Sequence, residues 1–180
     1  MDPKAPVDTI LVAADGEKAF VRVIGRGSFQ VSPALKKFVS AQIEKGCRRL
    51  ILDLKSCTGM DSTFMGVLAG LAVRIKSLNH GEVTAVNLSS KSLGLLETLG
   101  LTRLIRVHLL HETSDAAAET GSAGEMRLEM TPNKRLATET MLAAHETLVE
   151  IDPANLPKFQ DVLAYLREDL KSQGDADKKT

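Results

Sequence analysis

The feature of this sequence that most constrains its fold is the alternation of strand signals and helix signals up to about residue 110. Short runs rich in apolar or β-branched residues lie at 9–13, 19–25, 49–54, 82–88 and 104–109. A stretch with apolar residues at helical spacing follows the second, third and fourth of these runs. Helices that connect strands in this way return the chain to the same end of a sheet, which favours parallel pairing. The order therefore predicts an α/β domain whose mixed sheet has about four or five strands, with helices packed on it.

Turn and capping residues divide this pattern into elements. The segment 15–18, with sequence Asp-Gly-Glu-Lys, is a turn that joins the first two runs into a hairpin. Ser32 and Pro33 are expected to open the first helix, with Ser32 as its N-cap. Asp61 and Ser62 offer the same capping chemistry at the start of the second helix.

The second helix combines a broad apolar stripe with two glycines. The stripe is formed by Phe64, Val67, Leu68, Leu71, Ile75 and Leu78. Gly66 and Gly70 lie four positions apart, and residues four apart share one face of a helix. We expect the two glycines to let this helix lie close against the sheet.

The last third of the chain has a different composition. Residues 113–124 contain no large apolar side chain, which is typical of a flexible linker. Two helices are predicted after it, separated by a break at Asp152-Pro153. The predicted division is a domain over 7–111, a linker over 112–131 and a C-terminal helical hairpin over 132–172.

The second helix of this hairpin carries a narrow apolar seam. Its residues alternate spacings of three and four: Leu156, Phe159, Leu163, Leu166 and Leu170. A hairpin of this size is too small to bury such a seam alone. It is expected to pack on the first domain, on a second copy to form a homodimer, or on another protein, and packing within the chain is favoured.

Composition excludes several classes of function. Lys plus Arg and Asp plus Glu both number 23, so there is no basic surplus that would indicate a nucleic-acid partner. No apolar run approaches the ~20 residues of a membrane-spanning helix, so no direct membrane insertion is expected. Cys47 and Cys57 have no metal-binding or disulfide-framework spacing, which indicates free thiols in the cytoplasm. The histidines lack a second ligand at suitable spacing, so no metal and no cofactor are predicted.

Three segments together carry a resemblance to a known family. They are the strand Leu50-Ile51-Leu52-Asp53-Leu54, the stretch Met60-Asp61-Ser62-Thr63 before the second helix, and Leu95-Leu96-Glu97-Thr98-Leu99-Gly100-Leu101. Over roughly residues 9–109 the chain resembles the anti-sigma factor antagonists, bacterial proteins of the STAS (sulfate transporter and anti-sigma antagonist) fold. The resemblance implies a STAS fold and a regulator that works by partner switching rather than by catalysis.

The resemblance also implies a site. In this family an anti-sigma factor serine kinase phosphorylates the serine that follows the aspartate, and the unphosphorylated form binds that kinase. Carried onto this chain, Ser62 is the expected phosphoacceptor, with Thr63 as an alternative. Asp61, Ser62, Thr63, Phe64 and Met65 are the expected partner-binding residues. Phe64 departs from the family, which usually has a small residue there; its ring either turns inward or projects beside Ser62.

The chemistry of a helix start supports this reading independently. A serine in the first helical turn is expected to be exposed, and the free amides and the helix dipole there favour an anion. A phosphate adds about −1.5 to −2 charges at neutral pH. Such a group would change docking without unfolding the domain.

Other readings of the same residues stay open. Asp61 and Ser62 are common helix caps, so the stretch can be structural alone. The chain would then be a non-phosphorylated STAS scaffold subunit of a larger signalling or lipid-transport assembly. Asp53 and Asp61 can also be read as an acid–base pair. An enzyme is the least favoured reading, because no GxSxG motif surrounds Ser62 and the sequence identifies no base for it.

Overall fold

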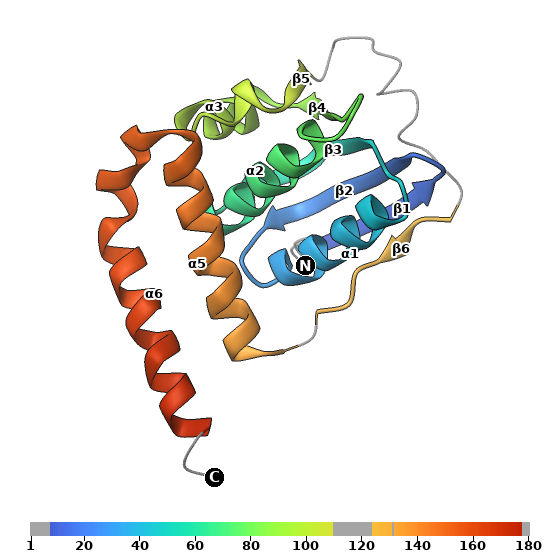
Figure 1. The fold of residues 1–180 in the computed structure, drawn as a ribbon. Coiled ribbons are helices and arrows are strands. Elements are labelled where there is room, and N and C mark those ends of the chain that lie inside the picture. Colours follow the sequence, from blue (N-terminus) through green and yellow to red (C-terminus); the bar gives the residue numbers. More distant parts are fainter. Residues whose placement is uncertain (1–7, 110–123, 131, 178–180) are drawn as a thin grey trace, which may run out of the picture.

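The computed structural model describes residues 8–109, 124–130 and 132–177, and its fold is α/β, as the sequence predicts (Figure 1). The strands are β1 (Thr9–Asp15), β2 (Lys18–Gly27), β3 (Arg49–Met60), β4 (Glu82–Leu88), β5 (Arg106–Leu109) and β6 (Met126–Arg127). The helices are α1 (Ser32–Glu44), α2 (Ser62–Lys76), α3 (Ser90–Thr98), α5 (Lys134–Ile151) and α6 (Leu156–Asp177). Short 3-10 turns at Leu101–Arg103 and Pro153–Asn155 complete the order.

The strands form one mixed sheet in the order β5-β4-β3-β2-β1-β6. The pairs β2–β3, β3–β4 and β4–β5 are parallel, whereas β1 runs antiparallel to both β2 and β6. The mixed sheet is therefore confirmed, with six strands instead of four or five. The sixth lies in the stretch 112–131 that was expected to be linker, of which residues 112–123 and 131 lie outside the described residues. A two-residue strand carries no periodicity of its own, and only its pairing with Leu11 and Val12 defines it.

Two element boundaries differ from the sequence prediction. Strand β3 continues to Met60 through the segment expected to be a loop, because β2 runs parallel beside it with two register shifts. Ser32 is not the N-cap of α1. It lies inside the helix, where its hydroxyl donates to the carbonyl of Ser28 at 2.9 Å.

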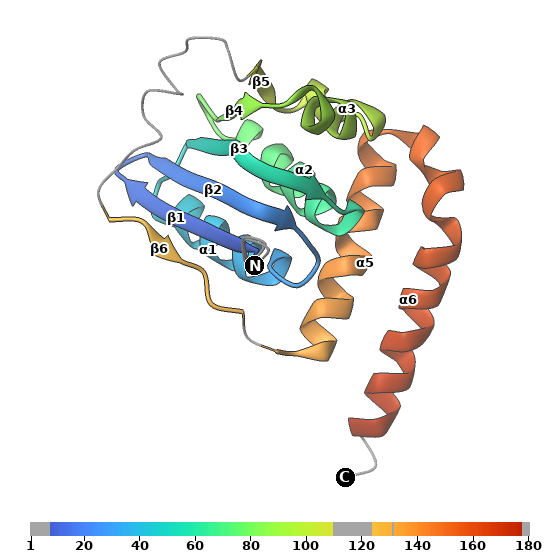
Figure 2. The ribbon, with the colours of Figure 1, turned by 180° about the vertical axis from the view of Figure 1, so that it is seen from behind.

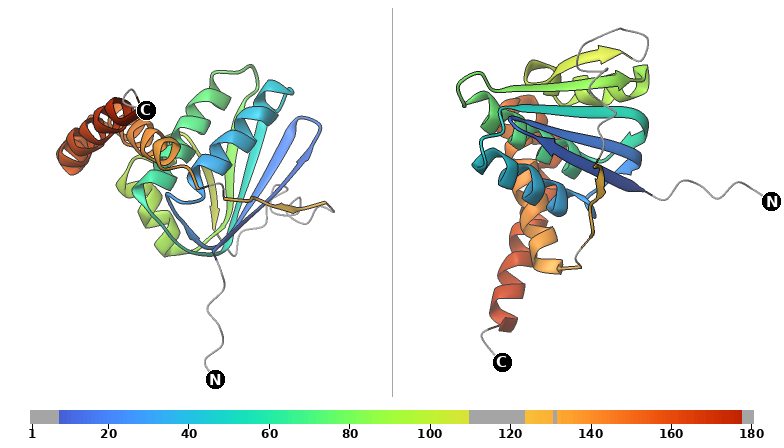
Figure 3. Two further views of the ribbon diagram at one scale, coloured as in Figure 1. Left: turned by 90° about the horizontal axis from the view of Figure 1, so that it is seen from below. Right: turned by 90° about the vertical axis from the view of Figure 1, so that its right-hand side faces the viewer.

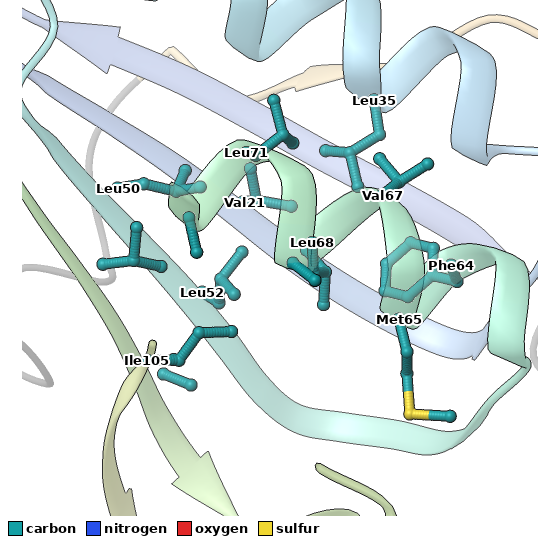
Figure 4. Packing of buried hydrophobic residues seen from close by; sticks show 14 of the residues in the cluster. Val21, Leu35, Leu50, Leu52, Phe64, Met65, Val67, Leu68, Leu71 and Ile105 are labelled. Atoms are coloured by element: carbon teal, nitrogen blue, oxygen red, sulfur yellow. The ribbon is translucent and has the colours of Figure 1, made fainter. Parts of the chain in front are cut away.

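Helices α1 and α2 lie side by side on one face of the sheet. The strands lie in front of both helices when the molecule is seen from behind (Figure 2). The core between these layers is formed by buried side chains of the sheet and of the two helices, among them Val21, Leu50, Leu52, Leu35, Leu68 and Leu71 (Figure 4). This arrangement brings the end of β3 and the start of α2 to one edge of the domain.

The C-terminal hairpin packs within the chain. Helix α5 lies against the side of α2 that faces away from the sheet, and α6 lies outside α5 (Figures 1 and 3). Leu163 and Leu166 of the predicted seam are buried, whereas Leu156 is 48% exposed. Leu148 of α5 is fully buried and belongs to the same core as the sheet. Ten of the fifteen residues of α2 are buried as a result, since the helix is covered on two sides.

Candidate functional site

Asp61 caps helix α2 and also holds the neighbouring loop. One carboxylate oxygen accepts the amide of Phe64 at 2.8 Å, which is the N-cap hydrogen bond. The other oxygen accepts the amide of Phe29 at 2.7 Å, from the segment between β2 and α1. The capping interpretation of Asp61 is therefore correct, and a role in kinase recognition stays a prediction.

Ser62 is the first residue of α2, and its side chain contacts the C-terminal hairpin. Its hydroxyl oxygen lies 2.9 Å from Nε2 of His145 in α5. Nδ1 of the same ring lies 2.8 Å from the main-chain carbonyl of Met141, which only accepts, so Nδ1 carries a hydrogen. In the neutral ring Nε2 is then the acceptor, and the Ser62 hydroxyl donates to it. The expectation of a freely exposed serine is wrong for this conformation, because α5 lies over it and leaves Ser62 partly buried.

The three residues that follow Ser62 are buried. Thr63 is 4% exposed, Met65 is 5% exposed and Phe64 is completely enclosed. Figure 4 shows Phe64 and Met65 among the core side chains. A Cβ atom added to Gly27 would lie 2.5 Å from the Phe64 ring, so the ring takes the space that a larger residue there would need. Phe64 thus turns inward, and neither it nor Met65 lies on the surface that was expected to bind a partner.

The two glycines of α2 face α5 rather than the sheet, which corrects the expectation for them. A Cβ atom added to Gly66 would lie 2.4 Å from the carbonyl oxygen of Ala144, so the two helix backbones touch there. A Cβ atom added to Gly70 would lie 3.7 Å from the hydroxyl of Thr147, an ordinary contact. Because neither glycine has a side chain, α5 lies close enough to α2 for His145 to reach Ser62.

Asp53 has a structural environment. It is 5% exposed and accepts hydrogen bonds from Nε of Arg22 at 3.0 Å, Nδ2 of Asn87 at 2.9 Å and the amide of Lys55 at 3.1 Å. Both Asp53 and Asp61 therefore hold the backbone and neighbouring strands in place, which argues against the acid–base pair. In the described part of the chain, no group of three or more His, Cys, Asp or Glu side chains is placed to hold a metal ion.

The two cysteines are free and buried. Burial raises the pKa of both the Cys47 and the Cys57 thiol above the ordinary value for cysteine. Neither has the lowered pKa of a reactive thiol, so both act as small apolar core residues.

His145 is the site residue that the sequence did not identify. It is 4% exposed, and its ring meets that of Phe159 in α6 edge-on, with centroids 4.8 Å apart. The available signal was its position: His145 lies four residues after Met141 and three before Leu148, on the apolar face of the predicted helix. A histidine on such a face indicates a buried ring, but the spacing cannot name its partner.

A serine hydrogen-bonded to a histidine can also form part of a catalytic site, in which the histidine acts as the base that activates the serine as a nucleophile. Here the imidazole is buried, and its second nitrogen is held by a main-chain carbonyl rather than by a carboxylate. Neither residue lines the larger pockets of the described residues. With neither residue in these pockets and no carboxylate behind the imidazole, the geometry gives the enzyme reading no support.

Comparison with known proteins agrees with the fold. A family model of the STAS domain matches residues 10–117, which leaves both helices of the C-terminal hairpin beyond the match. An anti-sigma factor antagonist from Mycobacterium paratuberculosis is similar at 20% identity and a TM-score of 0.51, covering 67% of this chain and 100% of that one. The Thermotoga maritima protein TM1081, assigned as an anti-sigma factor antagonist, also has 20% identity and a TM-score of 0.51, covering 60% and 90% of the two chains. At this identity the likeness is one of fold. No helix in the described ranges is both long and apolar enough to cross a membrane.

Proposed function

This chain belongs to the STAS domain family, and from that premise we propose that it is an anti-sigma factor antagonist-like regulator. In this proposal it binds an anti-sigma serine kinase, and phosphorylation of Ser62 ends the binding. The observation that carries the proposal is the position of Ser62. It is the first residue of α2, directly after the Asp61 cap, at the end of a central strand of the sheet.

The N-terminus of α2 can carry a phosphate without loss of the fold. The first amides of α2 and the helix dipole favour an anion, so a phosphate on Ser62 need not unfold the helix. A partner surface fitted to a neutral hydroxyl would meet a group of about −1.5 to −2 charges. The charge and the size of the phosphate would then prevent the partner from docking, while the domain stays folded.

Ser62 is a better acceptor than Thr63. The Thr63 side chain is 4% exposed, whereas Ser62 is only partly buried. A kinase would have to unfold the first turn of α2 to reach Thr63. We therefore assign the modification to Ser62 alone.

We further propose that the protein works by docking and has no catalytic activity of its own, with any ATP and metal belonging to the kinase. We place it in the cytoplasm, where such kinases find ATP and where free thiols persist. The hairpin seam is occupied within the chain, which favours a monomer over a homodimer through that seam.

The test is an affinity capture from host extract with three baits. Ser62→Ala keeps position 62 neutral and Ser62→Asp charges it. Ser90→Asp is the matched control, because Ser90 is also the first residue of a helix that follows a capping residue, and it is exposed. We expect the Ser62→Ala and Ser90→Asp baits to retain an ATP-binding serine kinase that the Ser62→Asp bait loses.

A different outcome would favour the scaffold interpretation. If all three baits retain the same proteins, a charge at position 62 does not control docking. Ser62 would then be a structural residue, and the chain a constitutive subunit of a larger assembly. Retention of no protein kinase by any bait would contradict the proposed partner.

A further inference from the structure

Helix α5 occupies the surface that a partner would need in order to reach Ser62. It supplies the hydrogen-bond acceptor for the Ser62 hydroxyl, and its backbone touches that of α2 one turn further along, at Gly66. We propose that α5 is an autoinhibitory segment, an intramolecular competitor of the partner that recognises the same neutral Ser62 hydroxyl. The identity of Ser62 as the modified residue rests on the function proposed above, whereas the closure by α5 does not.

The contact between α2 and α5 depends on matched small residues. Gly66 faces Ala144 and Gly70 faces Thr147, so the helices approach with little side chain between them. Along the line of Gly66 and Gly70 the contact is made by small residues, whereas Leu148, further along α5, is fully buried in the core that the hairpin shares with the sheet. The polar end of the contact is the hydrogen bond between Ser62 and His145.

The hairpin is held more firmly at its other end. Asn155, in the turn between α5 and α6, is fully buried and donates from Nδ2 to the carbonyls of Leu99 and Leu148, at 3.2 and 2.8 Å. Lys158 adds a hydrogen bond to the carbonyl of Thr98 at 2.9 Å. The turn is thereby fixed to the end of α3, and α5 can leave α2 while the chain stays anchored there.

A phosphate on Ser62 is incompatible with this closed arrangement. The 2.9 Å between Oγ and Nε2 holds one hydrogen and has no room for a phosphorus atom with three further oxygens. Since the backbones at Gly66 and Ala144 already touch, α5 makes room for the phosphate only by moving away from α2.

These contacts define a switch with two arrangements. With Ser62 unmodified, α5 and a partner compete for the start of α2, and partner or kinase gains access only when α5 is displaced. With Ser62 phosphorylated, neither α5 nor the partner can dock. The hairpin thus sets the fraction of unmodified protein whose Ser62 is accessible to a partner. Phosphorylation keeps α5 away from Ser62 and also prevents the partner from binding.

The closure can be measured without a partner by disulfide trapping in the full chain. A Cβ atom at position 70 would lie 3.7 Å from the γ-oxygen of Thr147, so Gly70→Cys with Thr147→Cys places two thiols within bonding reach. Phosphoserine is installed at position 62 by genetic encoding, and at position 90 as the matched control. The rate of 70–147 disulfide formation is followed by mass spectrometry under a fixed glutathione ratio.

We expect rapid cross-linking in the unmodified chain and in the chain with phosphoserine at 90. Phosphoserine at 62 should slow it by about tenfold or more, since closing α5 over an unpaired phosphate and an unpaired imidazole nitrogen costs more than the 1.4 kcal/mol that corresponds to tenfold. Equal rates in all three chains would overturn the proposal, as would faster trapping with phosphoserine at 62, which would mean that His145 binds the phosphate.

Hydrogen exchange supplies a second measurement that does not need the cysteines. Phosphoserine at 62 should increase exchange in peptides of α5 and leave β3 and β4 protected, whereas global unfolding would expose all of them. Unchanged protection of α5 would contradict autoinhibition. Because no kinase takes part, failure here is separate from failure to capture a kinase with the Ser62→Ala bait.

Discussion

At the scale of single residues, Asp61 joins two parts of the site that are distant in sequence. Its two carboxylate oxygens accept from Phe64 in α2 and from Phe29 in the loop before α1. The same residue therefore starts the helix that carries Ser62 and fixes the loop beside it. Any role in kinase recognition has to be separated experimentally from this structural role.

Asp61→Ala should lower the free energy of unfolding by about 1–2 kcal/mol, since it removes the N-cap hydrogen bond and the hydrogen bond to the Phe29 amide. Asp61→Asn should cost less, because asparagine also caps helices but can offer only one carbonyl oxygen to the two amides. Urea unfolding followed by circular dichroism checks both values. Equal stability of all three proteins would mean that solvent replaces the cap without loss.

At the scale of elements, the decisive contact is the one between α2 and α5. A glycine inside a helix costs about 1 kcal/mol relative to alanine, so two glycines in α2 indicate a packing requirement. The structure shows that the requirement differs between them. Gly66 lies against main-chain atoms of α5, whereas Gly70 lies opposite the flexible end of a side chain.

Gly66→Ala should therefore loosen α5, because its Cβ would lie 2.4 Å from a main-chain oxygen that cannot move alone. Gly70→Ala is the matched control in the same helix, and its Cβ meets only an ordinary contact at 3.7 Å. We expect lower thermal stability and faster hydrogen exchange in α5 for Gly66→Ala. The control should be unchanged or more stable by up to ~1 kcal/mol from its better helix propensity. Identical behaviour of the two variants would show that the helices are not closely packed at Gly66.

At the scale of the whole molecule, the hairpin is part of the core rather than an appendage. Ala144 and Leu148 belong to the same buried cluster as the strands, and Leu148 is fully buried. The sequence predicted a domain over 7–111 and a separate hairpin over 132–172, and that division stays a prediction. Within the described residues, α5 covers the outer side of α2.

A chain that ends at Pro132 should keep its strand content but unfold at a lower temperature and self-associate, since it exposes the apolar outer side of α2. A chain that ends at Ile151 keeps α5 and serves as the control, with a smaller loss. Thermal unfolding and analytical ultracentrifugation measure the two effects. A monomeric chain ending at Pro132 with the stability of the full protein would contradict this account.

The sequence by itself determined the elements and their order. Turn residues, caps and apolar periodicity are local chemistry, so five of the six strands in the described residues, the helices, the Asp61 cap and the helical hairpin could be predicted. The resemblance of three segments to the anti-sigma factor antagonists was sufficient to predict the family. Small errors, such as Ser32 as a cap, arose where a local preference was outweighed by the main-chain hydrogen bonds around it.

Only the tertiary structure decided what surrounds Ser62. Its contact with His145 joins residues 83 positions apart, and no periodicity in one helix can identify a partner in another. The inward turn of Phe64 depends on the space left at Gly27, and the orientation of Gly66 and Gly70 depends on which neighbour approaches α2. Local sequence fixes the conformation of each segment, whereas the choice of contacting faces depends on the free energy of burying all of them together.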